Sequence, residues 1–219
     1  MKVVIFDFDG TLTEKKGNIW KKIWQGLGHD IGPESYYVNL FKSFMAGKIT
    51  HKQWCDLTCE AFKEKGFCKS KLNEIIGNMT LIDGAERLIK FLYSKGYELH
   101  IVSGSIVYVI EKVVGDNKKY FKDIKANEFV FDANGDIAEI IGTKYDNEGK
   151  AIYIKELCQK SGCAPSDILF IGNSSNDEWV YQSGARTLCV NPDNAKSEDS
   201  TIWNKVVYTD DLSDLEDEI

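Results

Sequence analysis

The hydrophobic pattern divides the chain into three parts. Residues 3–6, "VVIF", form an apolar run whose β-branched and aromatic residues favour a buried strand. Between residues 19 and 77, apolar residues recur three or four positions apart, which predicts a group of helices. From residue 83 onward, helical patterns alternate with short apolar runs. This alternation predicts βαβ units and a mainly parallel sheet with helices on both faces.

In the alternating part, the pattern predicts specific helices and strands. Helices are expected at residues 83–96, 105–115, 147–162 and 178–184. One strand is expected in "YELHIVSG", residues 97–104, ending in a Ser-Gly turn. Two short strands around an Asn-Gly turn are expected at residues 127–140. Further strands are expected to start near residues 167 and 185.

The first strand has no crossover helix of its own before the long helical stretch begins. This order indicates that the helical stretch is an insertion after strand one. We therefore predict an α/β fold, a Rossmann-like doubly wound parallel sheet with an inserted α-helical cap domain. Residues 1–14 and 80–219 would form the core domain, and residues 15–79 the cap.

Composition and charge narrow the class of protein. The chain has 219 residues, is 43% hydrophobic and carries a formal net charge of -7, which argues against nucleic acid or an anionic membrane as partner. Part of this charge lies in residues 210–218, which we interpret as a solvated acidic end. No apolar stretch approaches the roughly 20 residues of a membrane span, and no secretory signal precedes the first strand. We therefore expect a cytoplasmic protein whose six cysteines are reduced.

Polar residues collect where the predicted strands end. Ligands of open α/β sheets bind beyond the carboxyl ends of the strands, so these residues are expected to meet. Carboxylates and amide oxygens there suit Mg²⁺, while a lysine and a Ser-Gly turn suit a phosphate oxyanion. The residues concerned are Asp7, Asp9, Thr11, Ser103, Gly104, Lys150, Asn173, Asn176 and Asp177.

These segments resemble the four motifs of the haloacid dehalogenase superfamily. "DFDGTLT" at residues 7–13 resembles the first motif, "IVSGS" at 101–105 the second, and "IGNSSND" at 171–177 the fourth. Lys150 is the preferred third motif because it follows a glycine at the start of a predicted helix, although Lys144 and Lys155 lie close by. The insertion lies where relatives of the phosphoserine-phosphatase type carry a helical cap.

The resemblance implies a role for each of these residues. Asp7 would be the nucleophile that forms an aspartyl-phosphate, and Asp9 would act as general acid and then base. The substrate's phosphate would be bound or steadied by Thr11, Ser103, Gly104, Lys150 and Asn176. Mg²⁺ would be bound by Asp7, Asp9, Asn173 and Asp177.

Two residues distinguish between possible activities. Asp9 favours phosphoryl transfer over dehalogenation, because a halide leaves without needing a proton. Asn173 stands where phosphatases of this family usually have aspartate, so one negative charge near the metal is missing. We expect a Mg²⁺-dependent phosphomonoesterase acting on a small phosphorylated metabolite. The alternative is a weakly active or inactive regulatory protein that binds phosphorylated ligands on the same scaffold.

The family pattern also bears on the substrate. Phosphoserine phosphatases read the amino acid with a glutamate nine positions after the nucleophile and an arginine on the cap; here these positions are Lys16 and Thr58. The chain's two arginines, Arg87 and Arg186, lie outside the predicted cap. We therefore expect a substrate other than phosphoserine, with further anionic or hydroxyl groups. Candidate contacts are Lys16 and His51, for which a purely solvated role is an equally open alternative.

Overall fold

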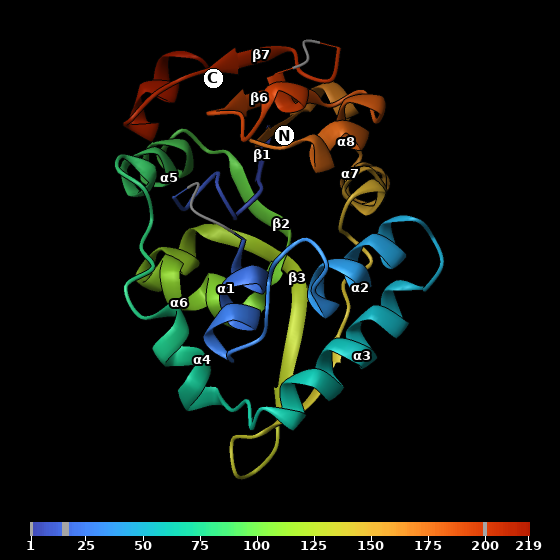
Figure 1. Cartoon of the computed structure of the whole chain (residues 1–219). Coiled ribbons are helices and arrows are strands. Elements are labelled where there is room, and N and C mark those ends of the chain that lie inside the picture. Colours follow the sequence, from blue (N-terminus) through green and yellow to red (C-terminus); the bar gives the residue numbers. More distant parts are fainter. Residues whose placement is uncertain (1, 15–17, 199–200) are drawn as a thin grey trace.

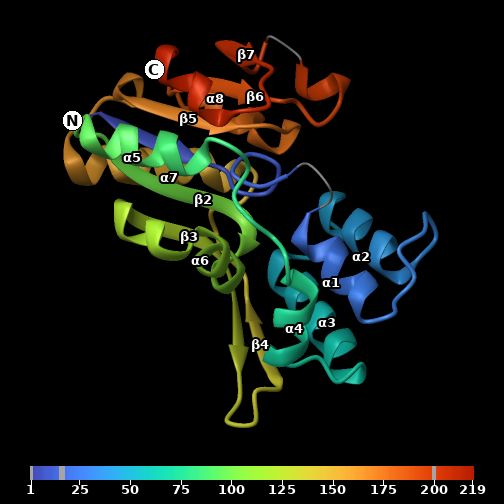
Figure 2. The same ribbon diagram turned by 90° about the vertical axis from the view of Figure 1, so that its left-hand side faces the viewer.

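The protein, represented here by a computed structural model, is built around a central β-sheet (Figures 1 and 2). The structure describes residues 2–14, 18–198 and 201–219. Within these residues, seven strands lie in the order β4-β3-β2-β1-β5-β6-β7. All neighbouring strands are parallel except β3 and β4. The strands are β1 (Val3–Phe6), β2 (Glu98–Ile106), β3 (Phe121–Phe131), β4 (Ile137–Ile141), β5 (Ile168–Gly172), β6 (Arg186–Val190) and β7 (Lys205–Val207).

The helices fall into two groups along the chain. A helical segment follows β1 and comprises α1 (Ile19–Gly26), α2 (Tyr36–Met45), α3 (His51–Glu64) and α4 (Lys69–Ile76). The helices that alternate with strands are α5 (Ala85–Ser94), α6 (Val107–Val114), α7 (Glu148–Ser161) and α8 (Glu178–Gln182). Both groups follow the apolar periodicity of the sequence.

Strand β1 explains why helices cover both faces of the sheet. Its four residues are all buried, and successive side chains of a strand point to opposite faces. Val4 and Phe6 belong to one core cluster, together with residues of α5 and α6. Val3 and Ile5 belong to a second cluster, together with residues of α7 and α8. The predicted Rossmann-like α/β fold is therefore confirmed.

The helical segment also packs against the β3–β4 hairpin, which extends away from the sheet (Figure 2). The backbone N–H of Ile137 donates to the carbonyl of Phe67 at 3.0 Å, and the thiol of Cys59 lies 3.7 Å from the carbonyl of Ala138. Strand β3 begins before the predicted position and is longer, because its first half pairs with β2 and its second half with β4.

Strand β2 differs from the prediction in a way that affects the site. The predicted Ser-Gly turn at residues 103–104 is wrong, since β2 continues through both residues to Ile106. Its pairing with β3 shifts register between Val102 and Ile106. A register irregularity, and not a turn, therefore shapes the backbone around Ser103 and Gly104.

The acidic end of the chain is more ordered than its charge indicates. A 3₁₀ helix at Leu212–Asp217 buries Leu212 and Leu215 completely, and the backbone N–H of Leu212 donates to the carbonyl of Asp83 at 2.8 Å. The prediction of a merely solvated end is therefore wrong, because two leucines anchor it beside α5. None of the helices in the described ranges has the length and apolarity to cross a membrane.

Candidate active site

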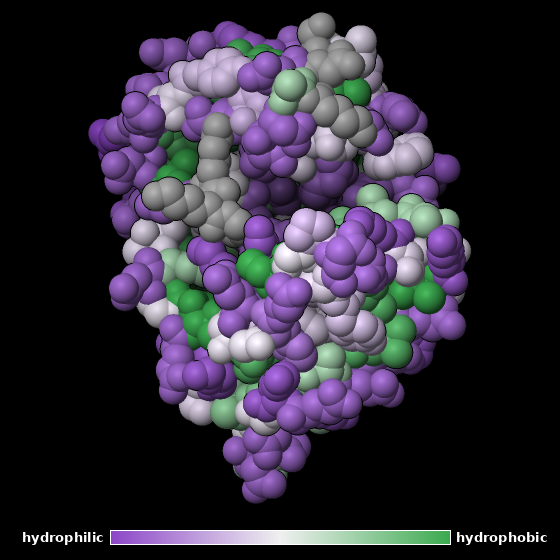
Figure 3. Space-filling view, in the orientation of Figure 1, coloured by the Kyte–Doolittle hydropathy of each residue, from purple (hydrophilic) through white to green (hydrophobic). Residues whose placement is uncertain are grey.

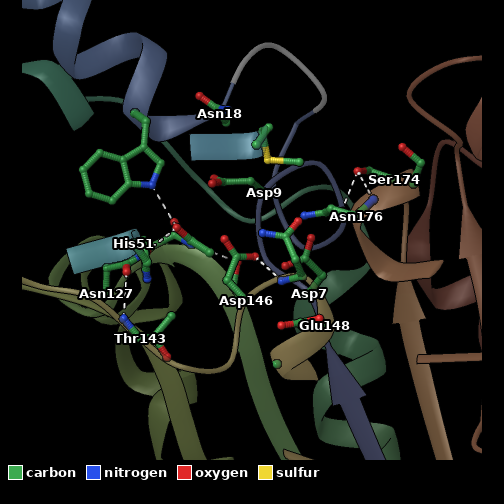
Figure 4. A pocket seen from close by; sticks show the side chains of 18 of the residues that line it. Asp7, Asp9, Asn18, His51, Asn127, Thr143, Asp146, Glu148, Ser174 and Asn176 are labelled. Carbon is green, nitrogen blue, oxygen red and sulfur yellow. Dashed lines mark hydrogen bonds between the residues drawn. The ribbon is translucent and has the colours of Figure 1, made fainter. Parts of the chain in front are cut away.

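The carboxyl ends of β1, β2 and β5 bring three of the predicted segments together. In the parallel register, Phe6 is paired with Ile101 on β2 and with Ile171 on β5. The next residue, Asp7, donates its backbone N–H to the carbonyl of Ile171 at 2.9 Å. Asp7, Ser103 and Asn173 consequently line one cavity of about 980 Å³. The opening is visible as a hollow between the core and the helical segment (Figure 3), and its lining is drawn in Figure 4.

Lys150 lies buried between two carboxylates. Its Nζ is 3.2 Å from Oδ1 of Asp7 and 2.5 Å from Oδ1 of Asp177, and its side chain is inaccessible to solvent. Burial works against the charge, but the carboxylates beside it raise the pKa of Lys150 above its ordinary value. Of the three candidate lysines, Lys150 lies against Asp7, whereas Lys144 pairs with Glu156 and Lys155 is exposed.

Asp177 is turned away from the cavity. Oδ1 accepts from Lys150, Oδ2 accepts from the backbone N–H of Ser174 at 3.4 Å, and the residue is absent from the cavity lining. Burial raises the pKa of Asp177 and the ammonium of Lys150 opposes this shift. The position suits an anchor for Lys150 better than a direct metal ligand.

Asp9 is a buried carboxyl group that lines the cavity close to Asp7. Burial followed by the charge of Asp7 raises the pKa of Asp9 to about 7. Its Oδ1 is buried and has no hydrogen-bond partner among the described residues. A carboxyl group with a pKa near neutrality is well matched to general acid–base work.

Ser103 and Gly104 line the cavity. Ser103 is buried, and a Cβ at Gly104 would come within 2.5 Å of the Asp146 carboxylate, so only glycine permits this close approach. The Gly104 carbonyl accepts two hydrogen bonds, from Trp20 Nε1 at 2.8 Å and from Asn127 Nδ2 at 2.7 Å. These bonds fix the backbone of the strand segment that is expected to bind the phosphate.

The donor set around Asn173 fits a magnesium ion. Asn173 is buried, its Oδ1 accepts from the Thr11 hydroxyl at 3.2 Å, and a Cβ at Gly10 would lie 2.5 Å from its Nδ2. The described residues contain no group of three His, Cys, Asp or Glu side chains arranged for a metal. Two carboxylates, from Asp7 and Asp9, and an amide oxygen nevertheless match Mg²⁺, which typically takes one or two carboxylates plus substrate oxygens. The unpartnered Oδ1 of Asp9 is consistent with such a ligand.

Residues 1–179 match the family of haloacid dehalogenase-like hydrolases. The chain belongs to this family. The assignment made from the four motifs is confirmed, and with it the prediction that the protein is a hydrolytic enzyme.

Several relatives of this haloacid dehalogenase-like hydrolase carry a more specific name. The chain is 23% identical over 190 residues to a phosphoserine phosphatase of Archaeoglobus fulgidus, covering 87% of this chain and 52% of that protein. It is 22% identical to a phosphoserine phosphatase of Methanocaldococcus jannaschii, covering 87% of each. The chain therefore spans about half the length of the first relative. Its fold is similar to a structure described as a phospho-aspartyl intermediate analogue of phosphoserine phosphatase, at a TM-score of 0.76, 20% identity and coverage of 100% and 98%.

Of three residues predicted to bind the phosphate in this haloacid dehalogenase-like hydrolase, one lines the cavity and two do not. Asn176 lines the cavity and its Oδ1 accepts from the Ser174 hydroxyl at 2.6 Å. Thr11 is fully buried behind the cavity wall, where it binds Asn173. Lys150 reaches the site only through Asp7, since it is absent from the lining.

The predicted specificity residues also differ in position. His51 lines the cavity and contacts the rings of Phe44 and Trp54, whose centroids are 5.2 and 5.9 Å away, and burial lowers the pKa of His51. Lys16 lies outside the described residues. Thr58 is fully buried and does not line the cavity, so it is not placed to contact a substrate there.

Sequence reasoning missed three residues that shape this site. The helical periodicity of residues 19–77 marks Trp20 only as an apolar position, yet its indole N–H donates to the Gly104 carbonyl. Asn127 binds the carbonyls of Gly104 and Ser105 and accepts from the Thr143 N–H at 2.9 Å. Asp146 lines the cavity near Gly104, and its place four residues before Lys150 is the one sequence signal that could have found it.

Proposed function

We propose that this hydrolase is a Mg²⁺-dependent phosphomonoesterase that acts on a small phosphorylated metabolite through an aspartyl-phosphate. The observation that carries the proposal is that Asp7, which lines the cavity together with Asp9, is paired with the buried Lys150. A nucleophilic carboxylate, a cation for the phosphate and an acid–base group are the parts that phosphoester hydrolysis needs. The names of the relatives support the same class of reaction.

The reaction would proceed in two steps. In the first, a carboxylate oxygen of Asp7 attacks phosphorus, the bond between phosphorus and the ester oxygen breaks, and Asp9 gives that oxygen its proton. In the second, Asp9 takes a proton from a water molecule whose oxygen attacks phosphorus, releasing inorganic phosphate and free Asp7. Asp9 lines the same cavity as Asp7, which supports its part in both transfers.

The phosphoryl oxygens would be held by backbone and side-chain donors. Ser103 with the Gly104 amide would bind one oxygen, and Asn176 would contribute a side-chain amide. Lys150 would offset the charge on Asp7 and on the phosphoryl group. Thr11 would steady Asn173 and would not touch the phosphate.

The metal would be held by Asp7, Asp9 and the amide oxygen of Asn173. When bound, Mg²⁺ supplies positive charge that neutralises the carboxylates and polarises the phosphoryl group. We assign Asp177 the anchoring of Lys150 in place of the metal-ligand role predicted from the motif, because it binds Lys150 and, unlike Asn173, does not line the cavity.

The helical segment would serve as a cap over this site. We propose residues 15–79 as the cap domain and residues 1–14 and 80–219 as the core, as the sequence predicts. Cap residues Trp20, His51 and Trp54 contribute to the cavity lining, which supports a role in substrate selection.

The substrate would be an ester other than phosphoserine. Arginine is the usual bidentate partner of a carboxylate, and the described residues that line the cavity include none. Phosphoserine hydrolysis is the second candidate, favoured by the relatives' names. The kcat/KM values for phosphoserine and for carboxylate-free phosphate esters, measured in parallel, decide between them, and a preference for phosphoserine would overturn our choice.

A turnover assay with 4-nitrophenyl phosphate tests the general proposal. Hydrolysis should require Mg²⁺ and should be abolished by Asp7→Asn, which keeps the shape of the side chain and removes the attacking charge. Asp9→Asn should also reduce turnover severely, and circular dichroism should show both variants folded. Absence of wild-type activity at millimolar Mg²⁺ on every ester tried would favour the alternative of a regulatory phosphate-binding protein.

A further inference from the structure

The part of the cavity beyond the phosphate site has a wall of aromatic residues. The cavity volume, about 980 Å³, is far larger than a phosphoryl group needs, so a sizeable leaving group can be accommodated. The wall comes from the helical segment and is formed by Trp20, Tyr37, Phe41, Phe44 and Trp54. We refer to these five residues as the aromatic wall.

Three of the five rings of the aromatic wall are in contact through Trp54. Trp54 lies at the centre, with ring centroids 4.7 Å from Trp20 and 6.1 Å from Phe44. Trp54 is only 5% exposed, and its indole N–H has no acceptor among the described residues. The wall therefore places five aromatic side chains of the helical segment in the lining of the cavity.

The remaining lining of the cavity is strongly acidic. Its carboxylate residues are Asp7, Asp9, Asp146, Glu148, Glu178 and Asp193. Among the described lining residues the only lysine or arginine is Lys144, which pairs with Glu156 at 2.7 Å. Figure 4 draws Asp146 and Glu148 in the same cavity as Asp7 and Asp9. A second negative group on the substrate would be repelled here, which argues against the additional anionic groups expected from the sequence.

Aromatic faces and carboxylates together select for positive charge. A ligand cation within about 6 Å of an aromatic centroid is attracted by the ring quadrupole, and quaternary ammonium groups are recognised by such aromatic cages. Asp146 and Glu148 add an electrostatic attraction of the same sign. No arginine lines the described cavity to bind a carboxylate on the same ligand.

We propose that the alcohol released by this enzyme carries an ammonium group and no carboxylate, and that the aromatic wall binds that ammonium. The inference rests on the proposed phosphomonoesterase function and names its substrate class as phosphate monoesters of amino alcohols. The P–O bond to the alcohol breaks, the alcohol leaves with the proton from Asp9, and water supplies the new oxygen on phosphorus. Among these esters, a quaternary ammonium fits the wall best, since its charge is spread over an apolar surface.

The test compares four esters on the wild-type protein with Mg²⁺. The alcohol part of phosphocholine and of phosphoethanolamine carries a positive charge and no negative charge. The alcohol part of glycerol 1-phosphate is uncharged, and that of phosphoserine carries both an ammonium and a carboxylate. We expect kcat/KM for phosphocholine to exceed that for glycerol 1-phosphate by about tenfold or more, with phosphoserine below phosphoethanolamine. A neutral ester that matches or exceeds both cationic ones would overturn the inference.

Variants locate the effect in the aromatic wall. Phe44→Leu should reduce the ratio of phosphocholine to glycerol 1-phosphate turnover by about threefold to tenfold. Phe41→Leu provides a second test that does not depend on core packing, because Phe41 is 44% exposed. Tyr36→Leu is the matched control, since Tyr36 lies on the same helix and outside the cavity lining. An unchanged ratio in both phenylalanine variants would contradict the assignment of the wall.

4-Nitrophenyl phosphate separates the two possible failures. If it is hydrolysed while the cationic esters show no advantage, the inference about the leaving group is wrong and the proposed function stands. If neither it nor any of the four esters is hydrolysed, the proposed function is wrong and the inference falls with it.

Discussion

Trp20 of the helical segment donates its indole N–H to the carbonyl of Gly104 at 2.8 Å. This bond links helix α1 directly to the strand segment expected to hold the phosphate. Asn127 donates to the same carbonyl from the core, at 2.7 Å. The backbone at Gly104 is therefore held from two sides, and its position depends on that of the helical segment.

Trp20→Phe should lower activity without unfolding the protein. The variant keeps an aromatic ring and loses one hydrogen bond, a change worth about 0.5–1.5 kcal/mol. Because Asn127 still satisfies the carbonyl, we expect kcat/KM to fall by roughly threefold to tenfold. Trp179→Phe is the control, since Trp179 lines the same cavity but does not bind Gly104. Equal losses in the two variants would show that the hydrogen bond is unimportant.

Local sequence pattern predicts the strand ends of the site well, because the carboxyl ends of parallel strands meet at one edge. It cannot predict partners that only the tertiary fold brings together. Trp20 lies 84 residues from Gly104 in the chain, and Asn127 lies 23 residues from it. The bonds that both make are to a backbone carbonyl, so no complementary side chain marks them in the sequence.

The fourth motif shows the same limit at a single residue. The motif identifies Asp177 as functional but does not say whether its carboxylate faces a metal or a lysine. Burial next to Lys150 decides that question in the fold. The two C-terminal leucines show the same limit of prediction from sequence. Leu212 and Leu215 are buried in the fold, but acidic residues surround them in the sequence, so the local pattern does not mark them as core positions.

Asn173→Asp should strengthen magnesium binding. The substitution replaces an amide oxygen with a carboxylate in a site where ligand charge sets the affinity for hard cations. We expect the Mg²⁺ concentration for half-maximal activity to fall by on the order of tenfold. Calorimetric titration of Mg²⁺ should show the same change without substrate.

A control variant separates direct binding of Mg²⁺ by residue 173 from the general effect of adding a negative charge to the cavity. Ser175→Asp adds a negative charge to the same cavity at a residue not assigned to the metal. It should change the Mg²⁺ requirement much less than Asn173→Asp. If both variants changed the Mg²⁺ requirement to a similar extent, the assignment of Asn173 as a metal ligand would be contradicted.

His100 should make the folded protein sensitive to mild acid. Its ring is buried between the Tyr153 hydroxyl at 2.7 Å and Glu98 at 3.0 Å, and burial lowers the pKa of His100 below its ordinary value of 6.5. Below pH 6.5 the unfolded state therefore binds a proton more readily than the folded state, so stability falls as pH falls. At pH 5.5 the loss from this residue is at most about 1.4 kcal/mol.

Urea unfolding at pH 7.5 and 5.5 measures this contribution. His100→Gln should lose less free energy of unfolding between the two pH values than the wild type. The other two histidines, His29 and His51, are present in both proteins, so their contributions cancel in the comparison. The same loss in variant and wild type would contradict the role of His100.

Lys150→Met should destabilise the protein as well as inactivate it. The substitution leaves the buried carboxylates of Asp7 and Asp177 without the cation that lies 3.2 and 2.5 Å from them. Removing one partner of a buried ion pair typically costs about 3–5 kcal/mol, because the other charge remains desolvated. We expect a loss of this order in urea unfolding without divalent cations, and no measurable turnover.

The double variant Lys150→Met with Asp177→Asn distinguishes structural from catalytic effects of Lys150. Neutralising Asp177 removes one of the two stranded charges, so the double variant should recover part of the stability that the single variant loses. Activity should not recover, because Asp7 and the phosphoryl group still lack their cation. If the double variant were no more stable than Lys150→Met, the two residues would not be coupled. If it regained turnover, Lys150 would act only by holding the fold.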